Sequence, residues 1–187
     1  MVWSPPKKVV YLSAAATCAS LACLMKDYTG GRRYEGSHRI DKKVVIITGS
    51  NTGIGKETAF ELAKRGAHVV MACRDARKCE VARQDIVLRT KNKYVYCRIC
   101  DLASQESIIQ FAERFKSGTG VTVNAVHPGI VDTEIVRHMS FFNSTLSAIF
   151  LKPFIWMFIK SPGQGARTTV YMALEESLKD VSGKYFK

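Results

Sequence analysis

Short apolar runs alternate with amphipathic segments along the first two thirds of the chain. The runs Lys43–Thr48 (KVVIIT), Ala67–Cys73 (AHVVMAC) and Tyr94–Cys100 (YVYCRIC) are rich in β-branched and aromatic residues, which predicts buried parallel strands. The segments between them, Lys56–Arg65 and Ala76–Arg89, predict helices. This order of strands and helices predicts an α/β fold, a Rossmann-type parallel sheet with flanking helices.

Two further elements are expected after the third strand. Ser104 is a typical N-cap for a helix whose apolar positions are Ile108, Ile109, Phe111, Ala112 and Phe115. Val121–Val126 (VTVNAV) predicts a late strand, separated from that helix by the short connection Ser117–Gly120.

The N-terminal segment Val9–Met25 carries no charge and is mostly apolar, with basic residues on both sides. Its 17 residues are at the short limit for crossing a bilayer as a helix. Three interpretations stay open: a membrane anchor, a cleaved signal peptide and a buried amphipathic helix. For an anchor, the heavier basic load after the segment places the rest of the protein on the cytoplasmic side.

The pattern divides the chain into three parts. Residues 1–26 are the N-terminal membrane anchor or signal, and an apolar helix is expected there. Residues 27–41 (DYTGGRRYEGSHRID) are rich in glycine and charge and predict a linker. Residues 42–187 are expected to form the Rossmann-like domain.

Composition agrees with one globular domain, since 47% of the 187 residues are hydrophobic and 24% are charged. The net charge of +12 raises the question of a nucleic-acid partner. Residues 1–93 carry a net charge of +10 and residues 94–187 only +2, so much of the excess flanks the apolar segment. With no zinc-finger or RNP-type spacing, we expect no nucleic-acid binding.

Three glycines follow the first strand directly, and the first predicted helix follows them. Gly49 allows a sharp turn off the strand, Gly53 allows the backbone to approach a pyrophosphate, and Gly55 allows the helix to pack close to the sheet. The helix N-terminus then offers free N–H groups to phosphates. This strand–turn–helix context predicts a dinucleotide site.

The end of the second strand predicts which dinucleotide is preferred. An acidic residue there would bind the ribose hydroxyls of NAD, but the strand ends in Cys73 and Arg74. Arg74 can pair with a 2′-phosphate, which favours NADP, and Lys78 is a weaker candidate for the same role. The alternative is that Arg74 only caps a surface loop.

The string TGSNTGIG at residues 48–55 resembles the TGxxxGIG signature of the short-chain dehydrogenase/reductase superfamily. The similarity continues through ACRDARKCE (72–80), CDLASQESI (100–108) and GTGVTVNAVHPGIVDTEI (118–135), which look like retinol dehydrogenases of the membrane-anchored, NADP-preferring branch. The resemblance implies hydride transfer between NADP(H) and a retinoid or similar apolar alcohol or aldehyde. It also implies membrane association through the N-terminal segment, at the endoplasmic reticulum or the mitochondrion.

The same resemblance implies a set of cofactor-binding residues, and it implies no metal. The pyrophosphate would lie on the turn, the adenosine phosphate near its start and Arg74, the adenine at the third strand, and the nicotinamide at the turn after the late strand. In that order the residues are Gly49, Thr52, Gly53, Ile54 and Gly55; Ser50, Asn51 and Arg74; Asp101 and Leu102; Pro128, Gly129, Val131 and Thr133. The very apolar segment Phe141–Ile159 corresponds to the family's variable substrate side.

The family's catalytic residues are missing from this chain. The family uses a Ser, an Asn and a Tyr-xxx-Lys pair, because the Lys lowers the pKa of a Tyr that acts as general acid and base. None of the seven Tyr is followed by Lys four residues later, so we assign no catalytic residue. An internal deletion near 116/117 would remove the middle strands, and the last strand would also be missing.

Two functional hypotheses follow from this absence. The first is a retinol dehydrogenase-like, NADP-dependent oxidoreductase with impaired catalysis. The alternative is a non-catalytic, membrane-anchored dinucleotide-binding or interaction isoform. In either case the late strand has lost its neighbours, so it must pair elsewhere or stay loose.

The cysteines suggest no metal centre. Cys97 and Cys100 form a single CxxC, and residues three apart on a strand point to opposite faces. Cys73 and Cys79 are expected to be small buried fillers, and reduced thiols are the simplest account of the set. His127, which precedes Pro128, is expected to be structural rather than catalytic.

Overall fold

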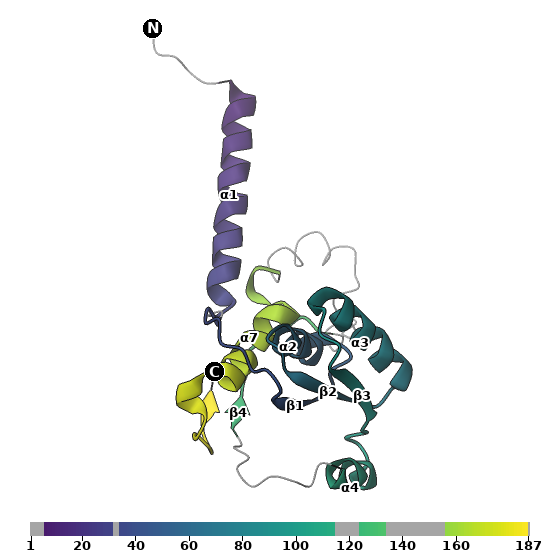
Figure 1. Ribbon diagram of the computed structural model, residues 1–187. Coiled ribbons are helices and arrows are strands. Elements are labelled where there is room, and N and C mark those ends of the chain that lie inside the picture. Colours follow the sequence, from purple (N-terminus) through teal and green to yellow (C-terminus); the bar gives the residue numbers. More distant parts are fainter. Residues whose placement is uncertain (1–5, 32–33, 115–123, 134–155, 187) are drawn as a thin grey trace.

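The computed structural model describes residues 6–31, 34–114, 124–133 and 156–186, and its centre is a three-stranded parallel sheet (Figure 1). The strands β1 (Val44–Thr48), β2 (His68–Cys73) and β3 (Val95–Ile99) lie in the order β1-β2-β3. Val45 is paired with Val69, which in turn is paired with Val95. The three predicted strands and their parallel arrangement are therefore confirmed.

Three helices lie on one side of this sheet (Figure 1): α2 (Gly53–Lys64), α3 (Ala76–Thr90) and α7 (Pro162–Leu174). Their apolar positions form one core with alternate residues of the strands, among them Val69, Met71 and Cys73 of β2. The core includes Ala59, Leu62, Val69, Met71, Cys79, Ile86, Val95, Ala166 and Val170.

The sheet is incomplete at the edge formed by β1. In the part of the chain that the structure describes, β1 pairs only with β2, so its second edge is open. Val44 and Ile46, on the face away from α2, are 61% and 41% exposed. The short helix α4 (Gln105–Glu113) buries no residue, although its predicted cap forms, with Ser104 Oγ accepting from Ser107 N at 3.2 Å.

The late strand pairs outside the main sheet. β4 (Ala125–Val126) runs parallel to β5 (Tyr185–Phe186). β5 follows the 3-10 turn η3 (Glu176–Leu178) in the chain. Asn124 joins the two segments, since its Nδ2 donates to Val181 O at 2.8 Å and its Oδ1 accepts from Lys184 N at 3.0 Å. Residues 121–123 of the predicted strand lie outside the described residues.

The N-terminal segment forms the helix α1 (Lys7–Thr29), which stands away from the domain in Figure 1. It has 23 residues, none of them buried. The interpretation as a buried amphipathic helix is therefore wrong. By length and composition it is the one helix among the described residues that could cross a membrane. It runs to Thr29, beyond the expected end at residue 26.

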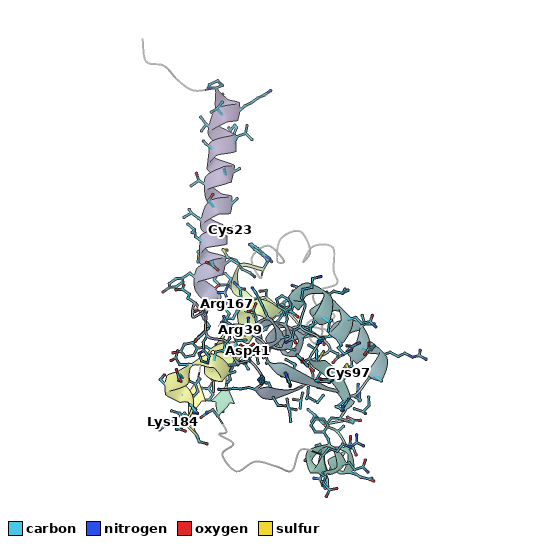
Figure 2. The ribbon with its side chains drawn as sticks, in the orientation of Figure 1. Cys23, Arg39, Asp41, Cys97, Arg167 and Lys184 are labelled. Carbon is cyan, nitrogen blue, oxygen red and sulfur yellow. A yellow bond between two sulfur atoms is a disulfide. The ribbon has the colours of Figure 1, made fainter. Side chains whose placement is uncertain are left out.

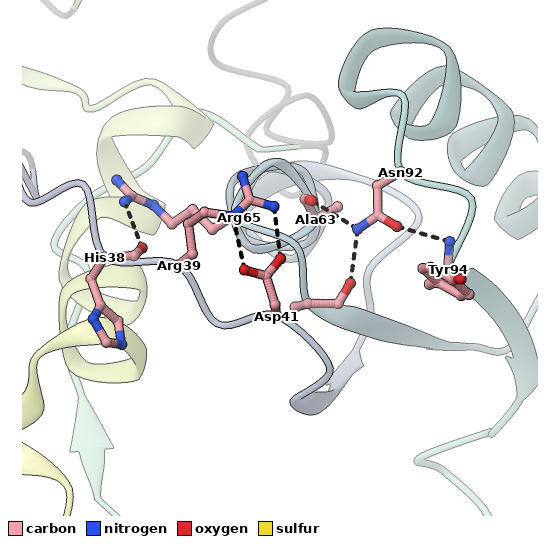
Figure 3. A network of polar contacts seen from close by, with 8 residues as sticks. His38, Arg39, Asp41, Ala63, Arg65, Asn92 and Tyr94 are labelled. Atoms are coloured by element: carbon pink, nitrogen blue, oxygen red, sulfur yellow. Dashed lines mark hydrogen bonds and ion pairs between the residues drawn. The ribbon is translucent and has the colours of Figure 1, made fainter.

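The segment before β1, expected to be a linker, packs against the end of α2. The guanidinium of Arg65 donates to the carbonyl oxygens of Gly36 (2.7 Å), His38 (3.2 Å) and Tyr34 (3.3 Å), and Ile40 is buried. Figure 3 shows Arg65 beside His38. A glycine-rich, charged composition does not reveal this packing, because it depends on carbonyl groups that every residue has.

Candidate nucleotide-binding site

The turn between β1 and α2 depends on two glycines in the left-handed backbone region. Gly49 has a φ of +61° and Gly53 a φ of +56°, values that side chains with a β-carbon rarely adopt. Gly49 N donates to Ala72 O at 2.9 Å, which joins the start of the turn to β2. The sharp turn expected of Gly49 is therefore present.

Gly55 is required for a different reason, because the backbone of the same turn folds over it. A β-carbon at this position would lie 2.5 Å from Gly49 O and 3.0 Å from Ser50 Cα. Any side chain would push the first turn of α2 away from the strand. The first turn of the helix and the end of β1 can meet only because residue 55 is glycine.

The N-terminus of α2 opens onto this turn without a side-chain cap. Thr52 is the N-cap residue, and its side chain accepts no hydrogen bond from the first helical turn. The first N–H groups of a helix are donors that need a partner, and the helix dipole favours an anion there. Turn and helix together fit a phosphate cradle.

The side chain of Ser50 holds the turn against β2. It is fully buried, and its Oγ donates to Ile47 O at 2.9 Å and lies 3.5 Å from Cys73 Sγ. The position of Ser50 near an adenosine phosphate stays a prediction. Asn51, which follows it, is half-buried.

Arg74 lies at the carboxyl end of β2 with an exposed side chain, and no ion pair to it is present in the described part of the chain. The cap of α3 is the next residue, Asp75, whose carboxylate accepts from Arg77 N and Lys78 N. Those hydrogen bonds, the one from Lys78 first, lower the pKa of Asp75. Arg74 is therefore not a cap, and its charge remains available.

Asp101 and Leu102 follow β3 at the same edge of the sheet. Cys100 N donates to Cys73 O at 3.0 Å, so the end of β3 stays beside the end of β2. Asp101 Oδ1 accepts from Ala103 N at 3.0 Å, which turns the chain, and Leu102 is 59% exposed. Both residues lie at the carboxyl end of the sheet, and their position beside an adenine stays a prediction.

The segment after β4 closes against the glycine turn. A β-carbon at Gly53 would lie 3.3 Å from Cγ2 of Thr133, and a β-carbon at Gly165 would lie 3.2 Å from Cγ1 of Ile54. The structure thus brings together the two parts of the predicted site that are farthest apart in the sequence. His127 is structural, as expected, since its Nδ1 accepts from Gly129 N at 2.9 Å.

Lys160 joins this end of the site, although the sequence pattern does not predict it. It forms an isolated parallel bridge with Val131, in which Lys160 N donates to Ile130 O (2.9 Å) and Lys160 O accepts from Asp132 N (2.8 Å). The bridge leaves the N–H and C=O of Val131 on the other side of the strand. The Nζ of Lys160 would be 3.4 Å from a β-carbon at Gly129.

The predicted site residues and the main cavity do not coincide. A cavity of about 620 Å³ lies between α2, α7 and the end of α1, lined largely by charged side chains such as Glu57, Lys64 and Arg167. It is lined by none of the predicted cofactor residues. Of the expected substrate side, only residues 156–159 lie within the described residues.

The cysteines are arranged differently from the expectation. Cys73 and Cys79 are buried, as predicted. Cys79 forms a disulfide with Cys97, which Figure 2 labels, so the reduced thiols expected at positions 79 and 97 are wrong. The pairing links α3 to β3. Among the described residues, no group of three or more His, Cys, Asp or Glu is arranged to hold a metal ion.

Comparison with known proteins identifies the family. The short chain dehydrogenase family model matches residues 43–120, which contain the glycine turn, Arg74 and the strands β1 to β3. Human retinol dehydrogenase 13 is 31% identical over 281 residues, covering 94% of this chain and 85% of that protein. The chain is a member of the short-chain dehydrogenase family. Mouse retinol dehydrogenase 12 is 31% identical over 253 residues, covering 79% and 78% of the two chains.

Solved structures of short-chain dehydrogenases support the fold. L-Sorbose reductase from Gluconobacter frateurii, complexed with NADPH and L-sorbose, superimposes with a TM-score of 0.65 at 16% identity, covering 81% of this chain and 97% of that one. Hydroxysteroid dehydrogenase from Escherichia coli gives a TM-score of 0.61 at 15% identity, covering 80% and 96%. The Rossmann-type arrangement predicted from the sequence is thus confirmed.

Proposed function

We propose that this short-chain dehydrogenase binds NADP(H) on the β1–α2 turn and transfers hydride slowly or not at all. The observation that carries the proposal is the turn itself. Two left-handed glycines and the Gly49–Gly55 contact bring an uncapped helix N-terminus to the end of a parallel strand. Peptide N–H groups presented in this way bind a pyrophosphate without any charged side chain.

Arg74 supports the preference for the phosphorylated dinucleotide. Its exposed guanidinium stands at the carboxyl end of β2, where the family reads the adenosine ribose, and Cys73 supplies no competing carboxylate. A guanidinium can bind a phosphate through two parallel hydrogen bonds. The solved relative L-sorbose reductase was crystallised with NADPH, which agrees with this preference.

The segment Pro128–Thr133 supports a nicotinamide position. The bridge with Lys160 uses Ile130 O and Asp132 N, so the N–H and C=O of Val131 remain for another partner. Together these two groups match the acceptor and donor of a carboxamide. Thr133, which touches Gly53, would keep this edge next to the phosphates. Bound NADP(H) would supply or accept the hydride.

Slow or absent turnover follows from the sequence. No Tyr is followed by Lys four residues later, so the usual proton donor and acceptor has no counterpart at that spacing. The alignment with human retinol dehydrogenase 13 runs over 281 residues, 94 more than this chain contains. We attribute that excess to an internal deletion near 116/117, which would remove the middle strands of the sheet.

The same proposal extends to substrate and location. Relatives named retinol dehydrogenase make a retinoid or a similar apolar alcohol or aldehyde the natural ligand class. The exposed apolar helix α1 would anchor the chain in a membrane, of the endoplasmic reticulum or the mitochondrion. The second candidate function is a membrane-anchored isoform that binds the dinucleotide without turnover. The absence of a Tyr-xxx-Lys pair favours this candidate.

The test combines binding with turnover on the full chain in detergent. We expect NADPH fluorescence to report saturable binding, and NADPH-dependent reduction of retinal to stay near that of a heat-treated control. Arg74→Ala should weaken NADPH binding about tenfold or more and leave NADH binding nearly unchanged, because one charge-assisted contact is lost. Lys64→Ala, at the opposite end of α2, is the matched control. Absence of NADPH binding by the folded parent chain would overturn the proposal.

A further inference from the structure

The C-terminal end of α1 is in direct contact with the segment that precedes α7. Lys26 Nζ donates to the carbonyl oxygens of Trp156 and, at 2.5 Å, of Ile159. The same ammonium lies 4.7 Å from the centre of the Trp156 ring. Gln164, in the first turn of α7, donates to Lys26 O at 2.9 Å. Trp156 is therefore fixed beside the last turn of the apolar helix.

A second set of contacts keeps α7 at the same place. Arg167 Nη1 donates to Gly31 O at 2.6 Å, and its Nη2 lies 3.5 Å from a carboxylate oxygen of Asp27. Figure 2 shows Arg167 near the base of α1. The start of α7 is thus joined to the base of the helix by Lys26 and by two residues that follow it, Asp27 and Gly31.

Beside this junction two aromatic side chains are exposed. Trp156 is 51% and Phe158 is 58% exposed. Trp156 contacts Lys26 of α1, a helix with no buried residue, and Phe158 is two positions further along the chain. Large exposed apolar groups that continue an apolar helix mark a contact surface. Lys26 is the basic residue in the last turn of α1, and a basic residue directly after an apolar stretch is typical of a membrane boundary.

The depth of these residues follows from helix length. The 23 residues of α1 extend over about 35 Å, slightly more than the hydrocarbon core of about 30 Å. Lys26 is three residues from the end of the helix, so it lies near one boundary of that core. The ring of Trp156 is at the same level, which is the depth that tryptophan prefers in membrane proteins.

We propose that Trp156 and Phe158, together with Lys26, form a second membrane contact at the boundary between lipid headgroups and acyl chains. This inference rests on the proposed anchoring by α1 and adds a surface of the domain itself. The partner is the bilayer surface on the side of the domain. This contact orients the start of α7 toward the lipid, together with the neighbouring bridge between Lys160 and Val131.

The test measures the depth of Trp156 directly. The chain contains two tryptophans, Trp3 and Trp156, so Trp3→Phe leaves Trp156 as the sole emitter. The full chain is reconstituted into phosphatidylcholine vesicles that carry bromine near the headgroup or near the acyl-chain end. We expect shallow bromine to quench Trp156 about twofold more strongly than deep bromine, as for an interfacial ring.

A tryptophan placed elsewhere is the matched control. Ile109, on α4, is 58% exposed, and Figure 1 shows α4 at the end of the structure away from α1. In the background Trp3→Phe and Trp156→Phe, the substitution Ile109→Trp should give emission that neither lipid quenches. Vesicle flotation distinguishes the second membrane contact from anchoring by α1. Flotation without quenching of Trp156 would overturn this inference alone, whereas failure to float would overturn the proposed anchoring and this inference with it.

Discussion

Thr133 lies against Gly53, so the segment after the late strand closes directly on the glycine turn. A β-carbon at position 53 would be 3.3 Å from the methyl carbon Cγ2 of Thr133. The two residues come from halves of the chain that the proposed deletion joins. Their contact places the segment proposed to hold the nicotinamide beside the glycine turn, even though β4 pairs with β5 and not with the main sheet.

Gly55→Ala should reduce NADPH affinity by about tenfold or more, because losing even one or two phosphate contacts costs that much. The new methyl group would meet Gly49 O at 2.5 Å, and the first turn of α2 would have to move. Gly163→Ala is the control, since its β-carbon would meet only Glu57 Oε2, at 3.7 Å. Titration of NADPH fluorescence measures both. Equal affinities for the two variants would contradict the proposed position of the pyrophosphate.

Asn92→Ala should lower the free energy of unfolding by about 2–3 kcal/mol. Asn92 Nδ2 donates to Ala63 O (2.8 Å) and Ala67 O (2.9 Å), and its Oδ1 accepts from Tyr94 N, as Figure 3 shows. The side chain thus joins α2 to the starts of β2 and β3. Chemical denaturation in detergent measures the loss. Gln110→Ala, which removes an exposed amide, should change stability by less than about 0.5 kcal/mol.

The ion pair between Lys56 and Asp85 joins α2 to α3 and should make stability depend on pH. Lys56 Nζ lies 2.7 Å from Asp85 Oδ2, and this hydrogen bond is the main cause that lowers the pKa of the Asp85 carboxyl. Because the pKa is lower in the folded state, the ion pair stabilises the fold at pH values above the unfolded-state pKa, which is about 4. This stabilisation is lost as the pH falls toward the folded-state pKa. We expect a coupling of about 0.5 kcal/mol at pH 7, since the pair is partly exposed.

A double-mutant cycle checks this pair. Lys56→Met, Asp85→Asn and the double variant are unfolded at pH 7 and again at about pH 3, below the usual carboxyl pKa. The coupling energy should be present at the higher pH and smaller at the lower one. A coupling energy that is the same at both values would show that the charge of Asp85 does not contribute.

Reduction of the disulfide between Cys79 and Cys97 should destabilise the protein by about 2–4 kcal/mol. The two residues are 18 positions apart, so the link restricts a loop of moderate length in the unfolded chain. Denaturation with and without dithiothreitol measures the effect. The variant with Cys79→Ala and Cys97→Ala should not respond to reductant, and a parent chain that also fails to respond would exclude the link in solution.

Local patterns predicted the local elements well. The β-branched runs predict the three strands, Ser104 is the predicted cap, Gly49 has the left-handed conformation of a sharp turn, and Gly55 has the close backbone approach that its role requires. In these cases a few neighbouring residues determine the backbone. The relation of Arg74 to its strand is of the same kind, because the residue follows directly from the end of β2.

Contacts between distant segments were not accessible to the same reasoning. Three contacts depend on which elements lie side by side. They are the bridge between Val131 and Lys160, the disulfide between Cys79 and Cys97, and the hydrogen bonds from Arg65 to the segment before β1. Ser50 shows the limit for single side chains. Its place in the motif was recognised, but whether its hydroxyl faces a ligand or the core depends on the packing against Cys73.

The bonds from Arg167 to Asp27 and Gly31, and from Gln164 to Lys26, fasten the domain to the foot of α1. If α1 crosses a bilayer, a domain held in this way does not rotate freely relative to the helix. The open β1 edge of its sheet then keeps one orientation to the lipid surface. Encounters with a ligand dissolved in the membrane would then be governed by lateral diffusion in two dimensions. The relevant concentration would be the number of molecules per area of membrane, not per volume of solution.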